Sequence, residues 1–367
     1  MRLAVDERYV RERERLGQQR CGLQRAVFAA RNEEHGRDEH DQSDDEDSEH
    51  AGEHGSDYRT WGYDARRMQN AELEGRLRAA RDCDAWVGVL AEFFTAHGLV
   101  FGHGTDNAGD EAYWLLRHLT GWRDLGWRAP PPDVVQRAVD LASQRVTSRK
   151  PLAYLIKSAW FAGLEFAVDE RVLVPRSPIA EVIERGFAPW CALNPGDRVL
   201  DIGTGSGCIA IAVAHYCPDV NVDATDISPE ALDVAAANVA RHGVAERVRL
   251  VCADLFPPGD QRYRVIVSNP PYVPLADVAT LPPEYRHEPE IGLASGKTGF
   301  DAAERIVRGA AARLTPDGVL VLEVGAGAEA FAAAHSRLPL IAIEFEHGGD
   351  GVFVATAAEI EEFLRDG

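Results

Sequence analysis

Short apolar runs bounded by turn-forming residues recur along the second half of the chain. Each such run is typical of a strand that is covered on both faces of a sheet. The runs lie at residues 198–202, 220–225, 247–252, 264–268, 319–324, 340–345 and 352–355. Segments with helical spacing separate most of them, and the last two runs flank a glycine-rich turn. The pattern therefore predicts an α/β fold, with a mostly parallel sheet that ends in an antiparallel pair.

The first half of the chain has a different period. From Ala71 to Arg149 the apolar residues recur every three or four positions, which predicts amphipathic helices. Three stripes carry the signal: Trp86, Val87, Leu90, Phe93 and Phe94; Tyr113, Leu115, Leu116 and Leu119; Val134, Val135, Ala138, Val139 and Leu141. We therefore expect a small helical domain at residues 71–150, which we interpret as the substrate-recognition domain.

Residues 160–175 change from helical spacing to alternation. The alternation predicts two strands around a turn at Asp169-Glu170. We expect a hinge β-hairpin within a linker at 151–180, followed by the sheet domain at 181–367.

Composition separates the start of the chain from the rest. Residues 33–57 contain twelve acidic residues and a single arginine, with Ser, Gly and four histidines among them. Such a segment buries too little apolar surface to offset the entropy of ordering, so residues 1–70 are expected to be a disordered acidic and His-rich extension. Its histidines follow no fixed ligand spacing, and we predict no metal site.

Charge and cysteine content narrow the class of protein. The formal net charge of −20 argues against general affinity for nucleic acid or anionic membrane. No apolar run approaches the roughly 20 residues of a membrane span, and residues 1–31 have no secretory apolar region. The six cysteines form no Cys-x-x-Cys pair, which is typical of reduced thiols in a cytoplasmic protein.

A glycine-rich loop follows the run at 198–202. It reads Asp201-Ile202-Gly203-Thr204-Gly205-Ser206-Gly207, a G-x-G-x-G spacing that differs from the dinucleotide pattern G-x-G-x-x-G. Bare backbone allows close approach of a ligand, and Asp201 stands where a cationic amino group can be held. The candidate cofactor-binding residues here are Asp201, Gly203, Thr204, Gly205 and Gly207. A phosphate loop at Gly296-Lys297-Thr298 is rejected because Ile291 occupies the position that needs glycine.

Two further acids end the next two predicted strands. Asp226, followed by Ile227, stands where an acid accepts hydrogen bonds from a ribose diol. Asp254, followed by Leu255, can meet an adenine amino group. Each acid alone is more often a helix cap or a loop charge, but the acids and Asn269 come in chain order at successive strand ends. A ligand with a cationic amino group, a ribose and an adenine is S-adenosylmethionine.

The run at 264–268 ends in Asn269-Pro270-Pro271-Tyr272. Neither proline has an N–H, so the Asn269 amide and the Pro270 carbonyl form a stiff pair of acceptors. An aromatic face beside such a pair suits an NH2 group on a planar carbon. A simple strand-ending turn is an equally good interpretation of these four residues alone.

Together with the glycine loop and the helical front, this tetrapeptide resembles the HemK-like protein-glutamine N-methyltransferases. The resemblance implies a seven-stranded Rossmann-like class I methyltransferase sheet and S-adenosylmethionine as cofactor. It implies catalytic roles for Asn269, Pro270, Pro271 and Tyr272, and cofactor contact by Asn269. Substrate contacts would come from Asn269, Pro270, Tyr272 and Arg176, although Arg176 can equally be a structural charge of the hinge.

Two branches of that family are weighed against each other. Residues 149–181 and 98–108 are similar to the branch that acts on a large-subunit ribosomal protein, which makes a basic ribosomal protein the expected partner. The alternatives are the release-factor branch, a nucleic-acid amino-methyltransferase, and a non-catalytic adenosylmethionine-binding module. The nucleic-acid enzyme would need a basic surface, which this acidic chain does not suggest. The binding module would not need the acceptor turn formed by Asn269 to Tyr272, which we call the Asn269 corner. The oligomeric state is not predicted.

Overall fold

The computed structural model describes residues 68–122, 125, 128–346 and 348–365. Met68–Phe345 and the residues from Gly349 onward form one compact unit. Nearly all of the predicted acidic extension at 1–70 lies outside the described residues.

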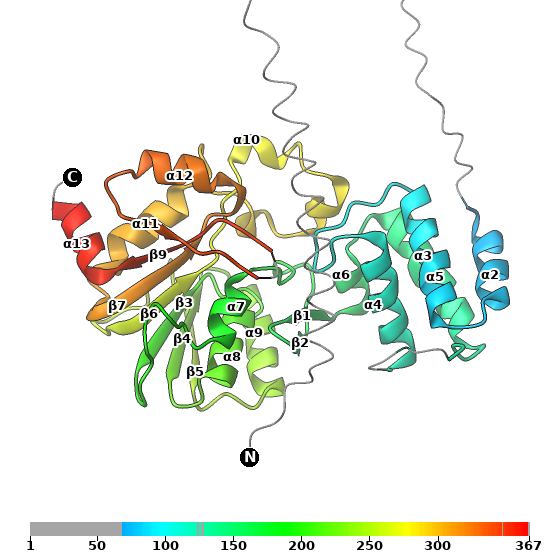
Figure 1. Ribbon diagram of the computed structural model, residues 1–367, viewed down its shortest axis with the longest axis horizontal. Coiled ribbons are helices and arrows are strands. Elements are labelled where there is room, and N and C mark those ends of the chain that lie inside the picture. The colour runs from blue at the N-terminus through cyan, green and yellow to red at the C-terminus, as the bar shows by residue number, and fades with distance from the viewer. Residues whose placement is uncertain (1–67, 123–124, 126–127, 347, 366–367) are drawn as a thin grey trace, which may run out of the picture. The chain divides into compact units, whose positions relative to one another are not determined.

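The predicted seven-stranded sheet is present, in the order β5-β4-β3-β6-β7-β9-β8 (Figure 1). The strands are β3 (Arg198–Ile202), β4 (Asn221–Asp226), β5 (Val248–Cys252), β6 (Tyr263–Ser268), β7 (Leu314–Glu323), β8 (Ile341–Ala342) and β9 (Val352–Thr356). Strands β3 to β7 are parallel, whereas β9 runs antiparallel to both β7 and β8. This confirms the α/β fold class, including the antiparallel C-terminal pair.

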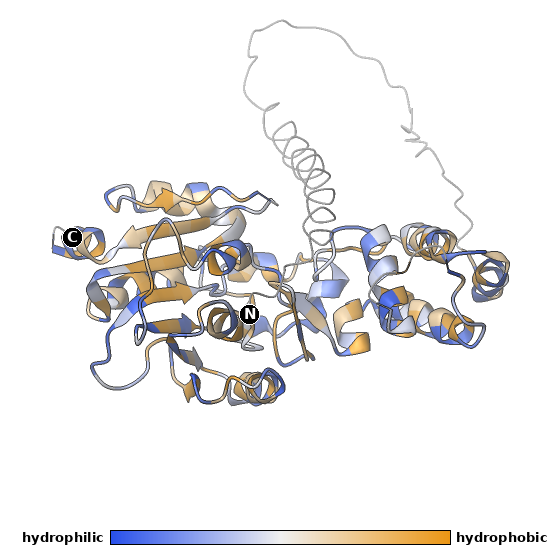
Figure 2. Ribbon diagram, turned by 60° about the horizontal axis from the view of Figure 1, so that its bottom comes forward, coloured by the Kyte–Doolittle hydropathy of each residue, from blue (hydrophilic) through white to orange (hydrophobic). Residues whose placement is uncertain are grey.

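In β3, β6, β7 and β9, successive apolar side chains enter two different cores, which explains why these runs are almost entirely apolar. In β6, Val265 and Val267 pack toward one helical layer and Ile266 packs toward the other, all fully buried. The first layer is α7 (Ile179–Glu184), α8 (Cys208–Tyr216) and α9 (Pro229–Arg241); the second is α11 (Asp301–Ala310), α12 (Ala328–Ala334) and α13 (Ala357–Arg365). The mostly apolar strands between the helices are visible in Figure 2.

Local sequence fixes where α9 begins and ends. The Ser228 hydroxyl accepts a hydrogen bond from Ala231 N at 3.1 Å, and Pro229 takes the first helical position. Gly243, just beyond the helix, has a φ of 66°, a left-handed conformation that glycine adopts without strain.

The helical front has its own core. Its helices are α2 (Asn70–Ala79), α3 (Cys83–Ala96), α4 (Ala108–Thr120), α5 (Val134–Ser148) and α6 (Leu152–Ile156). The predicted apolar stripes face inward: Trp86, Phe93 and Leu115 are among the buried residues. Burial of each such side chain contributes about 1.5–3 kcal/mol, so the stripes hold this part together.

The hairpin lies within the predicted linker, but its turn was placed wrongly. β1 (Ala159–Phe161) pairs with β2 (Leu164–Phe166) around Ala162 and Gly163, whose φ values are both positive, 47° and 73°. Two such residues give the tight turn that matches the twist of a hairpin. Asp169 does begin a turn, since Val172 N donates to its carbonyl at 3.1 Å, but that turn joins no paired strands.

A long connection leads from β6 to α11. It contains α10 (Leu275–Val278) and the 3-10 turns η1 (Pro283–His287) and η2 (Glu290–Gly292), none of which the hydrophobic pattern predicted. A third 3-10 turn, η3 (Gly325–Gly327), follows β7. Among the helices described, none combines the length and the apolar character needed to cross a membrane.

Candidate active site

Four polar residues named from the sequence lie at one edge of the sheet. Asp201 is the second-last residue of β3, and Asp226 is the last residue of β4. Asp254 follows β5, and Asn269 follows β6. Because these four strands are neighbours and parallel, their carboxyl ends meet at the edge where α/β sheets bind ligands.

Asp201 is fully buried and braces the glycine loop. Its Oδ2 accepts hydrogen bonds from Thr204 Oγ1 at 2.6 Å and from Ala210 N at 3.1 Å. Its Oδ1 has no hydrogen-bond partner within the described part of the chain. Burial raises the pKa of Asp201 to about 7, although both hydrogen bonds oppose the rise. A buried oxygen without a donor is the feature expected where a ligand brings one.

The loop glycines divide into two kinds. Gly203 and Gly205 have φ values of 72° and 53°, and a Cβ added at either would meet nothing within 4 Å. Space above bare backbone is therefore open at these two positions. At Gly207 a Cβ would lie 3.2 Å from Ile211 and 3.3 Å from Ala235, so this glycine allows α8 and α9 to pack closely.

Asp226 holds the loop from the second strand. Its Oδ2 accepts from Gly205 N and its Oδ1 from Ser228 N, both at 2.9 Å. Each carboxylate oxygen has a second lone pair, so Asp226 can still accept hydroxyl groups. Its neighbour Ile227 is 51% exposed, an apolar surface beside an acceptor.

Asp254 has a partner that the sequence did not reveal. Its carboxylate is half exposed and pairs with Arg305 Nη2 at 2.7 Å, a residue of α11. The next residue, Leu255, has a φ of 68°, and its carbonyl accepts from Thr225 Oγ1 at 2.6 Å. That hydrogen bond ties the β5 loop to β4.

The Asn269 corner is stiff, and its acceptors are free. Pro270 is buried, and the residue after the corner, Val273, pairs with a parallel segment through Val273 N to Leu293 O at 2.8 Å and Ser295 N to Val273 O at 2.9 Å. Across the described residues, neither the Asn269 side chain nor the Pro270 carbonyl takes part in a hydrogen bond. The backbone is thus fixed while two oxygens remain available.

Tyr272 is held against glycine backbone. A Cβ at Gly325 would lie 2.6 Å from Cε2 of the ring, and one at Gly299 would lie 2.4 Å from the Tyr272 carbonyl. Burial raises the pKa of the Tyr272 phenol, and the nearby Glu323 carboxylate raises it further. The sequence did not reveal Glu323, because this residue lies inside the apolar run at 319–324 and not after it.

Arg176 forms an ion pair with a buried carboxylate of the protein itself. Its two terminal nitrogens donate to Glu288 at 2.8 Å each, and its guanidinium lies 5.4 Å from the Tyr285 ring centroid. Glu288 also accepts from Val174 N at 3.1 Å and lies 3.5 Å from His103. Burial alone would raise the pKa of Glu288, but the charge and hydrogen bonds of Arg176 together with His103 outweigh it and lower the pKa to about 2. This bidentate pair supports the structural interpretation of Arg176, and a substrate contact stays a prediction.

A second buried carboxylate joins the same connection to the helical front. Glu284 has no exposed side-chain surface and lies 2.7 Å from Arg149 and 3.5 Å from Arg145. It also accepts from Val100 N at 3.0 Å. Arg145 in turn donates to Glu111 on α4 at 2.7 Å. The segment that follows the corner is therefore anchored to the helical front by buried charges.

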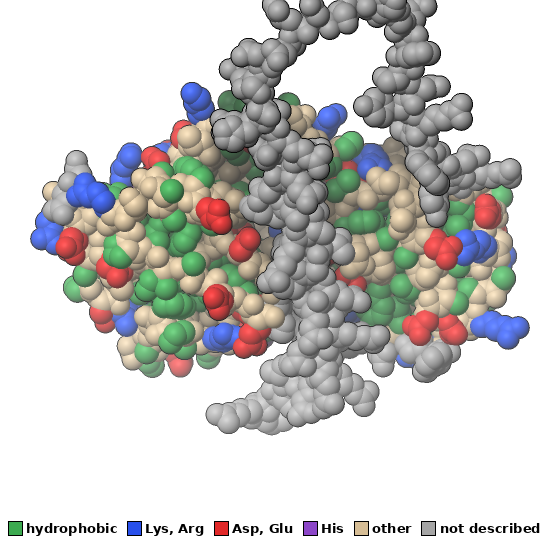
Figure 3. Space-filling model, turned by 45° about the horizontal axis from the view of Figure 1, so that its top comes forward, with side chains coloured by type: hydrophobic (Ala, Val, Ile, Leu, Met, Phe, Trp, Pro, Cys, Tyr) green, Lys and Arg blue, Asp and Glu red, His purple; other side chains and the backbone are tan. Residues whose placement is uncertain are grey.

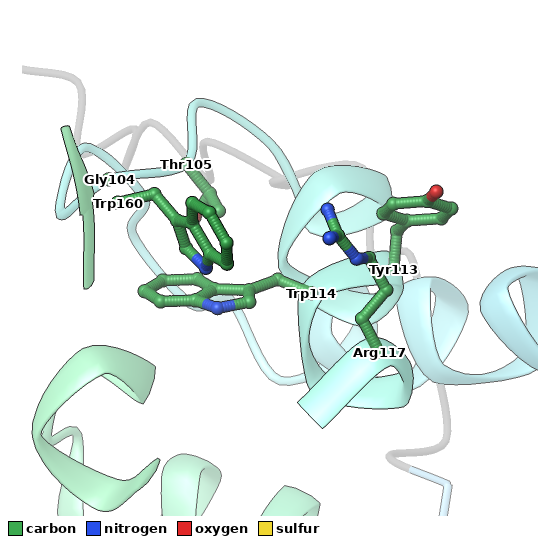
Figure 4. A pocket seen from close by; sticks show the side chains of 6 residues that line it. All are labelled: Gly104, Thr105, Tyr113, Trp114, Arg117 and Trp160. Atoms are coloured by element: carbon green, nitrogen blue, oxygen red, sulfur yellow. The ribbon is translucent and has the colours of Figure 1, made fainter. Parts of the chain in front are cut away.

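A separate hollow of about 120 Å³ contains none of the candidate site residues. It is lined by Gly104, Thr105, Tyr113, Trp114, Arg117 and Trp160. Figure 4 shows the Trp160 ring standing above Trp114, with the Arg117 guanidinium near Tyr113; that guanidinium lies 5.4 Å from the Trp160 ring centroid. We assign no chemistry to it. Elsewhere, the described residues contain no group of three or more side chains that could hold a metal ion. None of Cys83, Cys191, Cys208, Cys217 and Cys252 forms a disulfide bond.

A model of a known protein family matches the part of the chain that forms this sheet edge. The family model described as "Methyltransferase small domain" matches residues 190–280, a stretch that includes the glycine loop and the Asn269 corner. The sheet, the loop and the corner therefore define a methyltransferase domain.

Curated relatives are more specific. The chain is 43% identical over 275 residues to the ribosomal protein uL3 glutamine methyltransferase of Neisseria meningitidis serogroup A / serotype 4A, which covers 73% of this chain and 90% of the relative. It is 39% identical over 304 residues to the protein of the same name from Francisella tularensis subsp. tularensis, covering 81% and 96%. The chain belongs to the family of ribosomal protein uL3 glutamine methyltransferases, which confirms the resemblance inferred from the sequence.

Solved structures add little. A methyltransferase from Pyrococcus furiosus is 20% identical, covers 60% of this chain and 98% of its own, and has a TM-score of 0.41. This likeness is too weak to bear on function.

Proposed function

We propose that this protein transfers a methyl group from S-adenosylmethionine to the side-chain amide nitrogen of a glutamine in ribosomal protein uL3. The observation that carries the proposal is the stiff corner whose Asn269 amide oxygen and Pro270 carbonyl are free at the ligand edge of the sheet. The names of the curated relatives support the same reaction and substrate.

The corner supplies what the target nitrogen needs. An amide nitrogen is a weak nucleophile because its lone pair is shared with the carbonyl. Asn269 and Pro270 each accept one N–H of the target carboxamide, and Tyr272 presents an aromatic face beside it. Fixing the nitrogen in line with the methyl group gains on the order of 7–11 kcal/mol from orientation alone. The two acceptors also stabilise the positive charge that grows on the nitrogen, whose proton then leaves to water.

The cofactor supplies an electrophilic methyl group when it is bound. The free Oδ1 of Asp201 is suited to its ammonium group, and the spare lone pairs of Asp226 are suited to its ribose hydroxyls. Gly203 and Gly205 leave open space above the loop backbone for the cofactor, whereas Thr204 and Gly207 hold the loop in place through the hydrogen bond to Asp201 and close packing against α9. Ile227 and Leu255 provide apolar surface for the adenine, with Asp254 as acceptor for its amino group.

The surface charge favours a basic protein partner over RNA. The chain carries a formal charge of −20. On the face shown in Figure 3, blue Lys and Arg side chains are scattered among red Asp and Glu side chains, with no continuous basic patch in the part that shows. A nucleic-acid enzyme would need such a patch to bind phosphates. We therefore propose that the partner is a basic ribosomal protein, which the enzyme meets in the cytoplasm.

Competing substrates test the proposal. The purified protein is incubated with methyl-labelled S-adenosylmethionine and, in parallel, with uL3, a peptide-chain release factor or ribosomal RNA. We expect label on uL3, with peptide mass spectrometry locating it on a glutamine. Label on the release factor alone would reassign the substrate, and label on RNA alone would overturn protein methylation.

A further inference from the structure

The helical front holds a short part of the connection between the Asn269 corner and α11. This part is residues 283–288, which we call the strap; it comprises η1 and the residue after it. Glu284 of the strap has no exposed surface, and its Oε1 accepts from Val100 N at 3.0 Å and pairs with Arg149 at 2.7 Å. Arg145 lies 3.5 Å from the same oxygen and donates to Val100 O at 3.0 Å. The helical front thus surrounds this carboxylate with two cations and a backbone N–H.

Two further strap residues contact the helical front. The Tyr285 hydroxyl oxygen lies 3.0 Å from the place that a Cβ on Gly102 would take, so the phenol rests against the backbone of the loop before α4. His287 Nε2 donates to Ser148 O, at the end of α5, at 2.9 Å. Because these contacts come from side chains along the whole of η1, the helical front fixes the strap at several points.

A short stretch leads from the strap back to the Asn269 corner. It begins with η2, in which Leu293 N donates to Glu290 O at 2.9 Å. Two hydrogen bonds then join this stretch to the residue after Tyr272: Val273 N donates to Leu293 O at 2.8 Å, and Ser295 N donates to Val273 O at 2.9 Å. We call this pair of hydrogen bonds the Val273 bridge. It connects the corner to the strap through η2 alone.

The Asn269 corner is therefore supported at both ends. At its start, Ser268 Oγ donates to Ile202 O at 2.8 Å, which ties the end of β6 to β3. At its far end, the Val273 bridge ties it to the strap and so to the helical front. The first support comes from the sheet that also carries the cofactor-side acids, whereas the second does not. Loss of the second support should displace the Tyr272 end of the corner and leave the cofactor side in place.

We propose that the strap is the part through which the helical front positions the Asn269 corner, and that Glu284 is a positioning residue for methyl transfer. The inference rests on the proposed function, because that function gives the corner its role in holding the target carboxamide. Orientation of the reacting atoms supplies much of the rate, and a displacement of about 1 Å caused by a change far from the reaction can lower a rate about 10²-fold. The helical front therefore contributes to catalysis as well as to any contact with the substrate.

Glu111 offers a matched control for Glu284. Both carboxylates are buried beside Arg145, and Glu111 accepts from Arg145 Nε at 2.7 Å. Glu111 lies on α4 and also accepts from Thr105 Oγ1 at 3.3 Å, so both of these partners belong to the helical front. Glu111→Gln and Glu284→Gln each remove one buried charge and keep the shape of the side chain. Both should lower the temperature of unfolding, but only Glu284→Gln should loosen the strap.

The experiment measures three quantities well below the unfolding temperature of each variant. These are kcat at saturating uL3 and cofactor, the Kd for S-adenosylmethionine, and deuterium exchange of the amides of Val273 and Ser295 in peptides that contain them. Glu284→Gln should lower kcat about 10- to 100-fold, with the Kd within about twofold of wild type. The two amides should exchange at least about tenfold faster, because the Val273 bridge opens more often. Glu111→Gln should match wild type in kcat and in exchange.

Two results would overturn the inference. An equal loss of kcat in both variants would show that a change inside the helical front suffices, without the strap. A Glu284→Gln protein that is less stable, yet keeps the kcat and the amide exchange of wild type, would show that its ion pairs serve only the fold.

Two further arms keep the test decisive. If Glu284→Gln does not fold, His287→Ala takes its place, since it removes the hydrogen bond to Ser148 O and leaves the buried carboxylates intact. It should lower kcat and speed the same exchange, and wild-type values for both would reject the role. If wild type transfers no methyl to uL3, the proposed function fails, whereas the exchange of Val273 in Glu284→Gln and Glu111→Gln still decides whether the strap holds the corner.

Discussion

Two parts of the sheet edge, the cofactor side with Asp226 and Asp254 and the substrate side with Asn269, as we propose them, use these polar residues in opposite ways. On the cofactor side, Asp226 binds two backbone N–H groups and Asp254 pairs with Arg305. On the substrate side, the Asn269 side chain has no hydrogen-bond partner in the described chain. The acids shape the loops that surround a ligand, whereas the amide is kept free to meet one.

Buried ion pairs near Asn269 explain how its side-chain oxygen can remain without a hydrogen bond. The segment that follows the corner carries Glu284 and Glu288, both buried and both paired with arginines. These pairs fix the backbone, so that the corner does not need hydrogen bonds of its own side chain for rigidity. Substitutions on the cofactor side should therefore change mainly the affinity for the cofactor, whereas substitutions on the substrate side should change stability or turnover.

The largest effect is expected from Arg176→Ala. The change leaves the Glu288 carboxylate buried without its bidentate partner, and losing half of such a pair costs about 3–5 kcal/mol. Urea unfolding at pH 7 measures it. Arg171→Ala, which removes an exposed pair with Asp169, is the control and should cost at most about 1 kcal/mol.

The pH dependence of this effect has a definite sign. The pKa of Glu288 is depressed to about 2, so its contribution is fully present above its ordinary pKa and is lost as the pH falls toward 2. The stability gap between wild type and Arg176→Ala should narrow over that range. An unchanged unfolding midpoint with a raised KM for uL3 would instead make Arg176 a substrate contact.

The sequence predicts those parts of the site whose interacting residues are close together along the chain. The strands, the glycine loop and the alignment of Asp226 with Asn269 follow from local patterns and from the rule that parallel strands end at one edge. The partners of Arg176 and Glu323 do not, because they lie 112 and 146 residues away in the chain. The hairpin turn was missed because Ala162 carries no turn signal, while Asp169 does and forms a turn of another kind.

Asn269→Ala should have the next largest effect. Removing one preorganised hydrogen-bonding group from a transition state costs about 10²–10³ in kcat. We expect a fall of that size in methyl transfer to uL3, with cofactor affinity nearly unchanged, as measured by single-turnover kinetics and calorimetry. Asn70→Ala, at the exposed start of α2, is the matched control. Equal losses in turnover and cofactor affinity would place Asn269 on the cofactor side of the comparison.

Asp226→Ala should show the reverse behaviour. The variant loses the acceptors for Gly205 N and Ser228 N as well as those proposed for the ribose hydroxyls. We expect the Kd for S-adenosylmethionine to rise about 10- to 100-fold, while kcat at saturating cofactor stays within a few-fold of wild type. Calorimetry and initial rates separate the two quantities, and Asp219→Ala provides an exposed acid as control. A fall in kcat without a change in Kd would contradict the shaping role.

The smallest effect, from Asp254→Ala, is the sharpest test of what an acid on the cofactor side does. Asp254 and Arg305 form a half-exposed pair, and such pairs are worth about 1 kcal/mol or less, so either partner's loss changes stability little. If Asp254 only pairs with Arg305, Asp254→Ala and Arg305→Ala should alter the Kd for S-adenosylmethionine equally. If Asp254 also accepts the adenine amino group, Asp254→Ala should raise the Kd about fivefold, whereas Arg305→Ala, which frees the carboxylate, should leave it unchanged or lower it. We expect the second outcome, because a carboxylate at this strand end can serve the ligand only with the lone pairs that Arg305 leaves available.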